Sequence, residues 1–300
     1  MRIRYLTPVV FAVVVVTSIL FTTPAHADLG DQLAKLLADD GAVDDRFGFS
    51  VEISGTTAIV GAWQNDDNGS NSGSAYLYDI TTGLQLFKLL PDDGAAGDWF
   101  GHSVAISGTT AIVGARWGVG PGSGSAYLYD INTGLQLFKL LPDDGGFDSF
   151  GTSVAISGTT AIVGAAGDDD NGDSSGSAYL FDITTGLQLF KLLADDGAAG
   201  DNFGNSVAIN GTTAIVGAVQ DDDNGSDSGS AYLYDITTGL QLFKLLADDG
   251  AAGDWFGYSV AISGTTAIVG ARRDDDNGTD SGSAYLFDDH NRLTALQTST

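Results

Sequence analysis

Carboxylates gathered in polar loops are the residues of this sequence whose type and spacing could do the most direct chemistry. Four loops carry a run of Asp or Asn that ends in Asn-Gly, at residues 65–69, 168–172, 221–225 and 274–278. Clustered carboxylate and amide oxygens suit Ca²⁺, a hard cation that takes about six to eight oxygen ligands. The sequence therefore raises a calcium hypothesis for these loops.

The same loops differ from a calcium loop of the EF-hand type. The first ligand of such a loop stands five residues before its glycine, where this chain has Gln220 and Arg273, and no distal Glu follows. The alternative is a hairpin loop, in which Asn-Gly supplies the residues of positive φ. Calcium binding is left open for the loops that hold Asp168, Asp221, Asp223 and Asp274. No metal ligand and no cofactor are assigned.

Tryptophan and arginine mark the loops that depart from this pattern. The second copy of the loop, residues 116–122, has no acidic residue. Trp and Arg are favoured anchors of protein interfaces, and repeat proteins carry binding in variable loops on one face. The alternative is sequence drift in solvated loops. We predict a binding surface made of Trp63, Arg116, Trp117, Arg272 and Arg273.

The sequence has no recognisable set of catalytic residues. Glu52 is the only Glu, and it has no evident second acid for glycoside hydrolysis. The three His are His26, His102 and His290, and no Ser lies in an elbow-like motif. No Gly-rich phosphate loop follows a predicted strand. We expect a protein that is not an enzyme.

The chain is strongly acidic, with a net charge of −27 over 300 residues. A surface of that charge repels phosphate backbones, which argues against nucleic acid as a partner. There is no Cys, so no disulfide framework holds the fold. Hydrophobic residues make up 43% of the chain, which is enough for a packed core.

The first 27 residues have the features of an export signal. Two arginines precede an apolar stretch over residues 9–21, and a small-x-small cleavage site follows at residues 25–27. The alternative is a membrane anchor, but the stretch is shorter than the roughly 20 residues that span a bilayer. We expect a secreted, periplasmic or cell-surface protein that starts at Asp28 and has no membrane span after cleavage.

One unit of about 50 residues is repeated along the rest of the chain. Phe-Gly begins at residues 47, 100, 150, 203 and 256, with spacings of 53, 50, 53 and 53. Each unit has four short apolar stretches bounded by Gly-containing turns, which we name runs a, b, c and d. In the fourth unit these are residues 206–210, 213–218, 230–235 and 240–246. Four β-like runs per unit are the content of one propeller blade.

The phase of the repeat predicts how the ends of the chain meet. Residues 33–40 match residues 242–249, so the exported chain starts with a spare run d, and the last unit ends after run c at Asp288. We predict a single all-β domain over residues 28–300, a propeller of five four-stranded blades. Its units lie near residues 47–99, 100–149, 150–202, 203–255 and 256–288, with residues 33–38 completing the last blade.

Ring closure has a physical reason, because an open array leaves two sheet edges that invite aggregation. A competing interpretation makes residues 31–40 a short helix and residues 292–297 the last strand. Ala34 favours it, because the other copies of run d have Phe at this position.

Two charged positions recur once per unit. An Asp stands two residues before each Phe-Gly, and we interpret it as an acceptor for backbone N–H groups in the turn between runs d and a. A Lys recurs in run d, and a lysine on an outer strand deters edge pairing. The Asp residues are Asp45, Asp98, Asp148, Asp201 and Asp254, and the Lys residues are Lys35, Lys88, Lys139, Lys191 and Lys244.

The repeated motifs resemble a known family. Phe-Gly followed by Ile-Val-Gly-Ala and then Ser-Ala-Tyr-Leu-Tyr-Asp is similar to the FG-GAP repeat of the integrin α-chain propeller and its bacterial relatives, over about residues 33–288. The resemblance implies a β-propeller that binds an extracellular protein or glycan, or serves in adhesion. Integrin-type propellers have more blades than the five units here, and their calcium loops lie between Phe-Gly and Gly-Ala, where this chain has a short turn without acids. The bacterial variant with an Asp-rich loop after Gly-Ala is closer.

Overall fold

The computed structural model describes residues 31–118, 124–145 and 148–288. The export signal expected over residues 1–27 and the tail beyond Asp288 lie outside the described residues. Contacts divide the chain into two units, residues 1–35 and residues 36–300, and every described strand belongs to the second. Among the described residues, no helix has the length and hydropathy that a membrane span requires.

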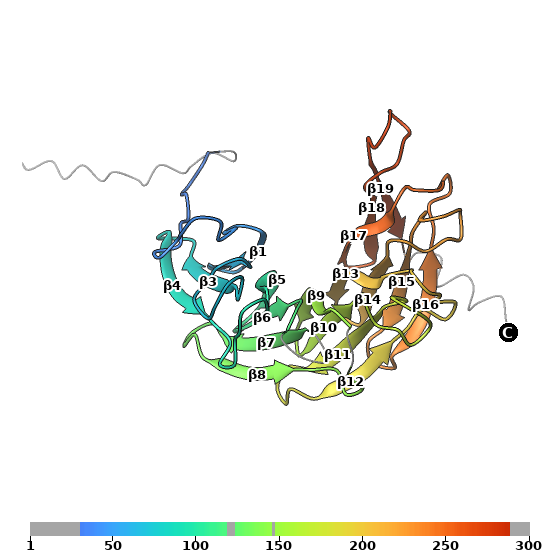
Figure 1. Cartoon of the computed structure of the whole chain (residues 1–300). Helices are drawn as coiled ribbons and strands as arrows, with labels where there is room; N and C mark the ends of the chain where they lie inside the picture. The colour runs from blue at the N-terminus through green and yellow to red at the C-terminus, as the bar shows by residue number, and fades with distance from the viewer. Residues whose placement is uncertain (1–30, 119–123, 146–147, 289–300) are drawn as a thin grey trace, which may run out of the picture. The chain divides into compact units, whose positions relative to one another are not determined.

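The described strands form five antiparallel sheets, each a meander in chain order (Figure 1). The first sheet has β1 (Ser50–Ser54), β2 (Thr57–Ala62), β3 (Ser74–Asp79) and β4 (Leu84–Leu89). The second has β5 (Phe100–Ser107), β6 (Thr110–Ala115), β7 (Ser125–Asp130) and β8 (Gln136–Leu140). The third has β9 (Phe150–Ser157), β10 (Thr160–Ala165), β11 (Ser177–Asp182) and β12 (Gln188–Leu192).

The last two sheets repeat this plan. The fourth has β13 (Phe203–Asn210), β14 (Thr213–Ala218), β15 (Ser230–Asp235) and β16 (Leu240–Leu245). The fifth has β17 (Phe256–Ser263), β18 (Thr266–Ala271) and β19 (Ser283–Asp288). The first strand of each sheet contacts the first strand of the next, from β1 and β5 to β13 and β17. Successive four-stranded meanders joined along their first strands are the blades of a β-propeller, so the predicted all-β fold with five blades is confirmed.

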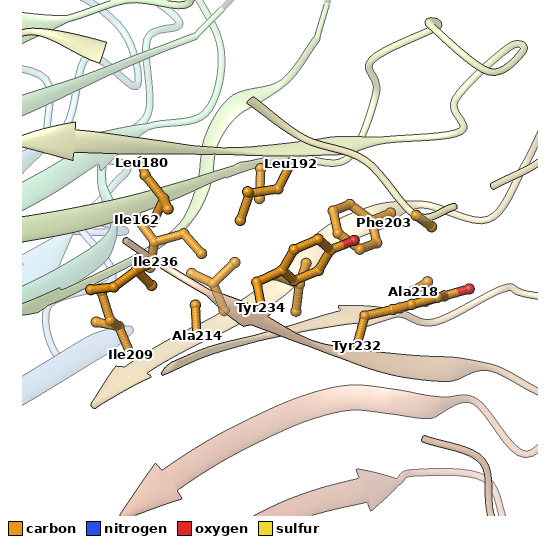
Figure 2. Close-up of a cluster of buried hydrophobic side chains, with 14 residues drawn as sticks. Ile162, Leu180, Leu192, Phe203, Ile209, Ala214, Ala218, Tyr232, Tyr234 and Ile236 are labelled. Carbon is orange, nitrogen blue, oxygen red and sulfur yellow. The ribbon is translucent and has the colours of Figure 1, made fainter. Parts of the chain in front are cut away.

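The core lies between consecutive sheets. Each interface packs Ile and Leu of one sheet against Phe, Val and Tyr of the next, as Figure 2 shows for the third and fourth sheets. There Ile162 and Leu180 of the third sheet face Phe203 and Tyr234 of the fourth. Burying one such side chain contributes about 1.5–3 kcal/mol. Consecutive sheets therefore stabilise one another.

The Phe-Gly motif joins neighbouring sheets. Phe100 is fully buried, and its backbone N–H donates to the carbonyl of Ser72 in the preceding unit at 3.0 Å. Gly101 follows with φ +86°, and a Cβ there would lie 2.2 Å from the Ser74 oxygen. Only glycine fits so close to a neighbouring backbone at that φ. The repeat therefore requires both residues of the motif at each blade boundary.

The predicted closing strand is not found in the described residues. Residues 31–38 have no regular secondary structure, and the fifth sheet has three strands. The competing short helix over residues 31–40 is also absent, because this segment has only a turn at its end. The alternative last strand over residues 292–297 lies outside the described part of the chain. Run d itself is a strand in the first four sheets, as expected.

Candidate functional site

The predicted binding residues lie where strand b of a blade ends. In the second sheet, β5 and β6 are antiparallel and Phe100 is opposite Ala115, so the residues before Phe100 and after Ala115 meet at one end of the sheet. The Trp117 N–H donates to the Asp98 carbonyl at 3.1 Å and fixes this meeting point. Trp99 has φ +57°, a conformation that bulky residues rarely adopt.

Aromatic rings from the first two sheets gather at this end. Trp99 is central: its ring centroid lies 4.3 Å from that of Trp63 and 5.9 Å from that of Trp117. The Phe49 ring centroid lies 5.8 Å from that of Trp63 and 5.1 Å from that of His102. We call this group the aromatic patch; its members are Phe49, Trp63, Trp99, His102, Arg116 and Trp117.

The aromatic patch has exposed rings and two buried hydrogen-bond donors without a partner among the described residues. Phe49 is 54% exposed and Trp117 is 40% exposed. The Trp63 Nε1 and Arg116 Nε atoms are buried and have no hydrogen-bond partner among the described residues. A buried donor without an acceptor costs about 1–3 kcal/mol. The Phe49 and Trp117 rings are thus open to solvent, whereas the two donors without a partner lie below the surface.

One cation and one neutral imidazole set the charge of the aromatic patch. The Arg116 guanidinium lies 5.6 Å from the Trp117 ring centroid, within cation–π range. Burial, assisted by the charge of Arg116, lowers the pKa of His102 to about 4. His102 is therefore neutral at pH 7, and its Nδ1 lies 3.3 Å from the Thr152 carbonyl. The patch offers one guanidinium and several π faces.

A second group with the same kind of residues lies at the equivalent end of the fifth sheet. The Arg273 guanidinium lies 3.6 Å from the Trp255 ring centroid. Arg272 lies 4.8 Å from the Tyr258 ring centroid and donates to its hydroxyl at 2.9 Å. We call Trp255, Tyr258, Arg272 and Arg273 the fifth-sheet patch. Of the predicted binding residues, Trp63, Arg116 and Trp117 lie together in the aromatic patch. Arg272 and Arg273 lie in the fifth-sheet patch.

Sequence reasoning missed the patch members that flank Phe-Gly. These are Phe49, Trp99, His102, Trp255 and Tyr258. The signal was present, because the residues just before and just after Phe-Gly differ between copies as much as the residues after Gly-Ala. In the third and fourth sheets they are small or polar: Ser149, Thr152, Asn202 and Asn205. The variable positions of the repeat therefore mark one end of every sheet.

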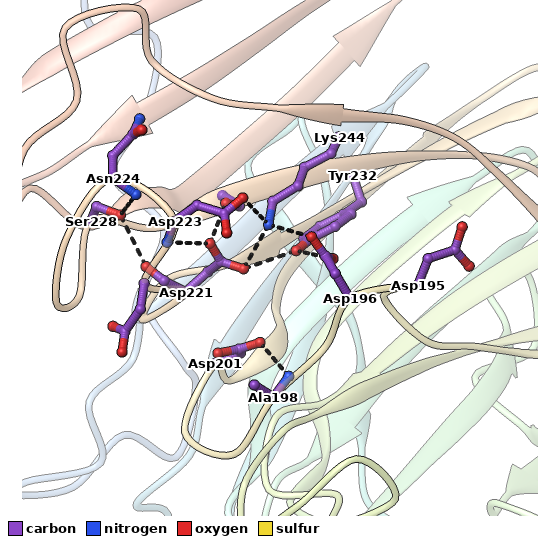
Figure 3. A network of polar contacts seen from close by, with 12 residues as sticks. Asp195, Asp196, Ala198, Asp201, Asp221, Asp223, Asn224, Ser228, Tyr232 and Lys244 are labelled. Carbon is purple, nitrogen blue, oxygen red and sulfur yellow. Dashed lines mark hydrogen bonds and ion pairs between the residues drawn. The ribbon is translucent and has the colours of Figure 1, made fainter.

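The acidic loops contain a lysine from the outer strand (Figure 3). The Lys244 Nζ lies 3.0 Å from Asp221, 2.6 Å from Asp223 and 2.8 Å from Asp196. The Tyr232 hydroxyl donates to Asp196 and Asp221. Burial opposes ionisation of Asp221, but its bonds to Ser230 and Lys244 keep its pKa below the ordinary value. The carboxylates of this loop thus surround an ammonium group.

The same ion cluster recurs in other blades. Asp144, Asp168 and Asp170 are close enough to hold a metal ion, and the Lys191 Nζ lies 2.5–2.9 Å from all three. In the first sheet Lys88 pairs with Asp40 and Asp67. In the second, whose loop lacks acids, Lys139 pairs with Asp93 alone. The recurring lysine therefore contributes charge neutralisation to the loop, in addition to any role at a sheet edge.

The Asp before each Phe-Gly has the predicted role as an acceptor for backbone N–H groups. It accepts the N–H of the residue three positions earlier in four units, at 2.6–2.7 Å, from Ala42, Ala95, Ala198 and Ala251. Burial raises the pKa of Asp201 to about 6. Glu52 likewise accepts the Ile106 N–H at 2.7 Å, and burial raises its pKa. These acids hold turns and sheets in place.

Comparison with known proteins agrees with this structure. A family model described as FG-GAP repeat matches residues 31–78, 84–129, 135–181, 187–234 and 240–287. The chain therefore belongs to the FG-GAP repeat family. Each matched segment begins in run d and ends in run c, which is the phase that the sequence predicts. No curated protein matches the chain.

Proposed function

We propose that the protein is an exported, non-catalytic binding or adhesion module of the FG-GAP propeller type. The observation that carries this proposal is the aromatic patch, in which partly exposed rings lie beside Arg116 and two buried donors without partners among the described residues. Trp and Arg are the residues that most often carry interface energy. Membership of a repeat family whose propellers often bind ligands supports it further.

The ligand class that fits is an extracellular protein or a glycan. Indole faces pack against apolar faces of a sugar or an aliphatic side chain, while the half-buried Arg116 guanidinium offers N–H donors to oxygen acceptors. Exposure outside the cell follows from the export signal expected over residues 1–27. Nucleic acid does not fit a chain with a net charge of −27.

An array of glycans and extracellular proteins tests the proposal. The probes are the wild-type chain, the double variant Trp63→Ala/Trp117→Ala, and the control Val219→Ala/Gln220→Ala. The control changes the two residues that follow Gly-Ala in the fourth sheet. We expect the wild type and the control to bind the same ligands and the Trp double variant to lose them. Equal binding by all three chains would remove the aromatic patch from the proposal.

The second candidate is a structural surface or matrix repeat protein without a specific ligand. The near identity of the five units favours it, because a specific site requires units that differ. In that case no array ligand would bind the wild type above background. The same array therefore separates the two candidates.

A further inference from the structure

Asn followed by Gly is a dipeptide that can change covalently without an enzyme. The backbone nitrogen of the Gly attacks the side-chain carbonyl carbon of the Asn and forms a cyclic imide. The amide nitrogen leaves as ammonia, together with the proton of the Gly N–H. Water then opens the imide to aspartate or isoaspartate. Glycine favours the attack because it has no Cβ in the way. The chain has five such pairs, which begin at Asn68, Asn171, Asn210, Asn224 and Asn277.

In the first, third and fourth sheets, the Asn-Gly pair of the acidic loop is held by the loop before the next Phe-Gly. In the fourth sheet the Asn224 side-chain amide donates to the Ala247 carbonyl at 3.2 Å. The Gly253 N–H donates to the Ser226 carbonyl at 2.9 Å. A Cβ on the half-buried glycine of each pair would lie 2.8–3.0 Å from an alanine Cβ of the next loop: Gly69 from Ala96, Gly172 from Ala199, and Gly225 from Ala252. Imide formation requires the Asn side chain and the Gly nitrogen to turn toward each other, and these contacts oppose that movement.

The acidic loop of the fifth sheet has the same hydrogen-bonded turn, but it is exposed. The Gly278 N–H donates to the Asp275 carbonyl at 2.9 Å. The Asn277 N–H donates to the Ser281 hydroxyl at 3.2 Å. Residues 277–281 are all exposed, and no described atom lies within 4 Å of a Cβ built on Gly278. The serines equivalent to Ser281 are buried, each 1% exposed: Ser72, Ser175 and Ser228. A loop with few packing contacts opens at a low cost in free energy.

Asn210 lies in a different setting, at the end of β13. It is opposite Thr213 in the ladder with β14, so its backbone is held in the extended conformation. Its side-chain Oδ1 accepts the Gly264 N–H at 3.3 Å. Because the ladder and this hydrogen bond both restrain the residue, we expect imide formation at Asn210 to be slow.

We propose that Asn277 is a site of spontaneous deamidation in the folded protein and reacts faster than the other four Asn-Gly pairs of the chain. All four acidic loops have the same turn around the pair, so the difference lies in the contacts that cover the loop. This assignment does not depend on the proposed function.

The new carboxylate would change the charge beside the fifth-sheet patch. The Arg273 guanidinium lies 3.6 Å from the Trp255 ring centroid, and its Nε lies 3.9 Å from Asp280 of the same loop. Repulsion by Asp274 already raises the pKa of Asp276. Isoaspartate also lengthens the loop backbone by a CH2 group. Deamidation therefore gives this loop a second form, which differs in both charge and backbone.

A time course of the full-length chain at mildly alkaline pH tests the proposal. Samples are digested, and the peptide of each Asn-Gly pair is followed by mass spectrometry through the mass change from –NH2 to –OH. Chromatography separates the aspartate and isoaspartate products. The same time course in concentrated guanidinium chloride is the control, because unfolding removes the contacts that distinguish the five pairs.

We expect Asn277 to react several-fold faster than each of the other pairs in the folded protein, and the five rates to converge in denaturant. Conversion at Asn277 that is no faster than at Asn224 in the folded protein would overturn the proposal. An excess at Asn277 that persists unchanged in denaturant would also overturn it, because local sequence and not packing would then set the rate.

Two matched variants provide a second measurement on intact protein. Deamidation adds negative charge, so incubated wild-type protein should develop an acidic species in ion-exchange chromatography. Asn277→Gln should remove most of that species, because a longer side chain forms the cyclic imide poorly. Asn224→Gln, at the equivalent position of the fourth sheet, should leave it in place. Loss of the species with Asn224→Gln, and not with Asn277→Gln, would contradict the assignment.

Discussion

Single lysines decide what the acidic loops can bind. Lys244 lies within 3.0 Å of three carboxylates, and Tyr232 donates to two of them. The spacing of acids in the sequence pointed to a cation, and the cation in the structure is a side chain of the protein. It comes from a strand 21 or more residues further along the chain, so loop composition alone could not identify it.

Calcium should therefore have little effect on stability. To bind, Ca²⁺ would have to displace an ammonium that already neutralises the loop. We expect the melting temperature of the wild-type protein to be the same with millimolar Ca²⁺ as with a chelator. A ligand that binds the native state tightly raises the melting temperature, so a clear rise with Ca²⁺, and none with Mg²⁺, would contradict this assignment.

The buried Asp201 should make stability depend on pH. Its folded pKa of about 6 is above the unfolded value near 3.9, so the folded state binds more protons between these values. The stabilisation is present below the unfolded pKa and is lost as the pH rises through about 6. Asp201→Asn removes this titration. The melting temperature of the variant minus that of the wild type should therefore increase from pH 4 to pH 7. A difference between the two proteins that does not vary with pH would contradict the raised pKa.

At the scale of elements, the Phe-Gly motif fixes each blade to its neighbour. Gly204 has φ +89°, and a Cβ there would lie 2.2 Å from the Ser177 carbonyl oxygen. Gly200 has φ +94°, and a Cβ there would meet no atom within 4 Å. A substitution at Gly200 therefore tests backbone strain alone, and a substitution at Gly204 tests the same strain together with a steric clash between sheets.

Substitution of these two glycines should have unequal effects. Gly200→Ala should cost about 1 kcal/mol, which is the strain of positive φ alone. Gly204→Ala adds the clash with the neighbouring backbone and should cost about 3 kcal/mol or more. Denaturant unfolding measures both. Equal losses would show that the close approach at Phe-Gly does not hold the sheets together.

Most elements could be predicted from the sequence, because Gly-containing turns bound short Val- and Ile-rich stretches five times over. Strand a was predicted too short: β13 starts at Phe203, because a register shift lets Phe203 pair with Ala218 beyond the regular ladder. The aromatic patch was predicted in part. Its members after Gly-Ala stood out in acidic loops, but Trp99 joins them only through the pairing of β5 with β6.

At the scale of the whole molecule, the residues that are the same in every unit form the core, and the residues that differ between units form the two patches. Four interfaces repeat one packing pattern. The aromatic and arginine residues that break the repeat lie in the first, second and fifth sheets, and the third and fourth sheets have small, aliphatic or polar residues at the same positions.

The two patches hold the same kinds of residue, Trp beside Arg, so we expect both to bind the same ligand. Trp255→Ala should weaken binding of the ligand that Trp63 and Trp117 bind, by roughly 10-fold. Asn202→Ala, at the equivalent position of the fourth sheet, is the matched control and should leave the affinity unchanged. If Trp255→Ala behaves like this control, the fifth-sheet patch has a separate role.

The central claim is that the aromatic patch is the ligand site, and an equilibrium titration of the strongest array ligand tests it most directly. The titrated chains are the wild type, Trp63→Ala/Trp117→Ala and Val219→Ala/Gln220→Ala, each with its melting temperature recorded. We expect the Trp double variant to remain folded at the titration temperature and to bind about 30-fold or more weakly, and the control to bind within about twofold of wild type. A folded Trp double variant that binds as tightly as wild type would contradict the account.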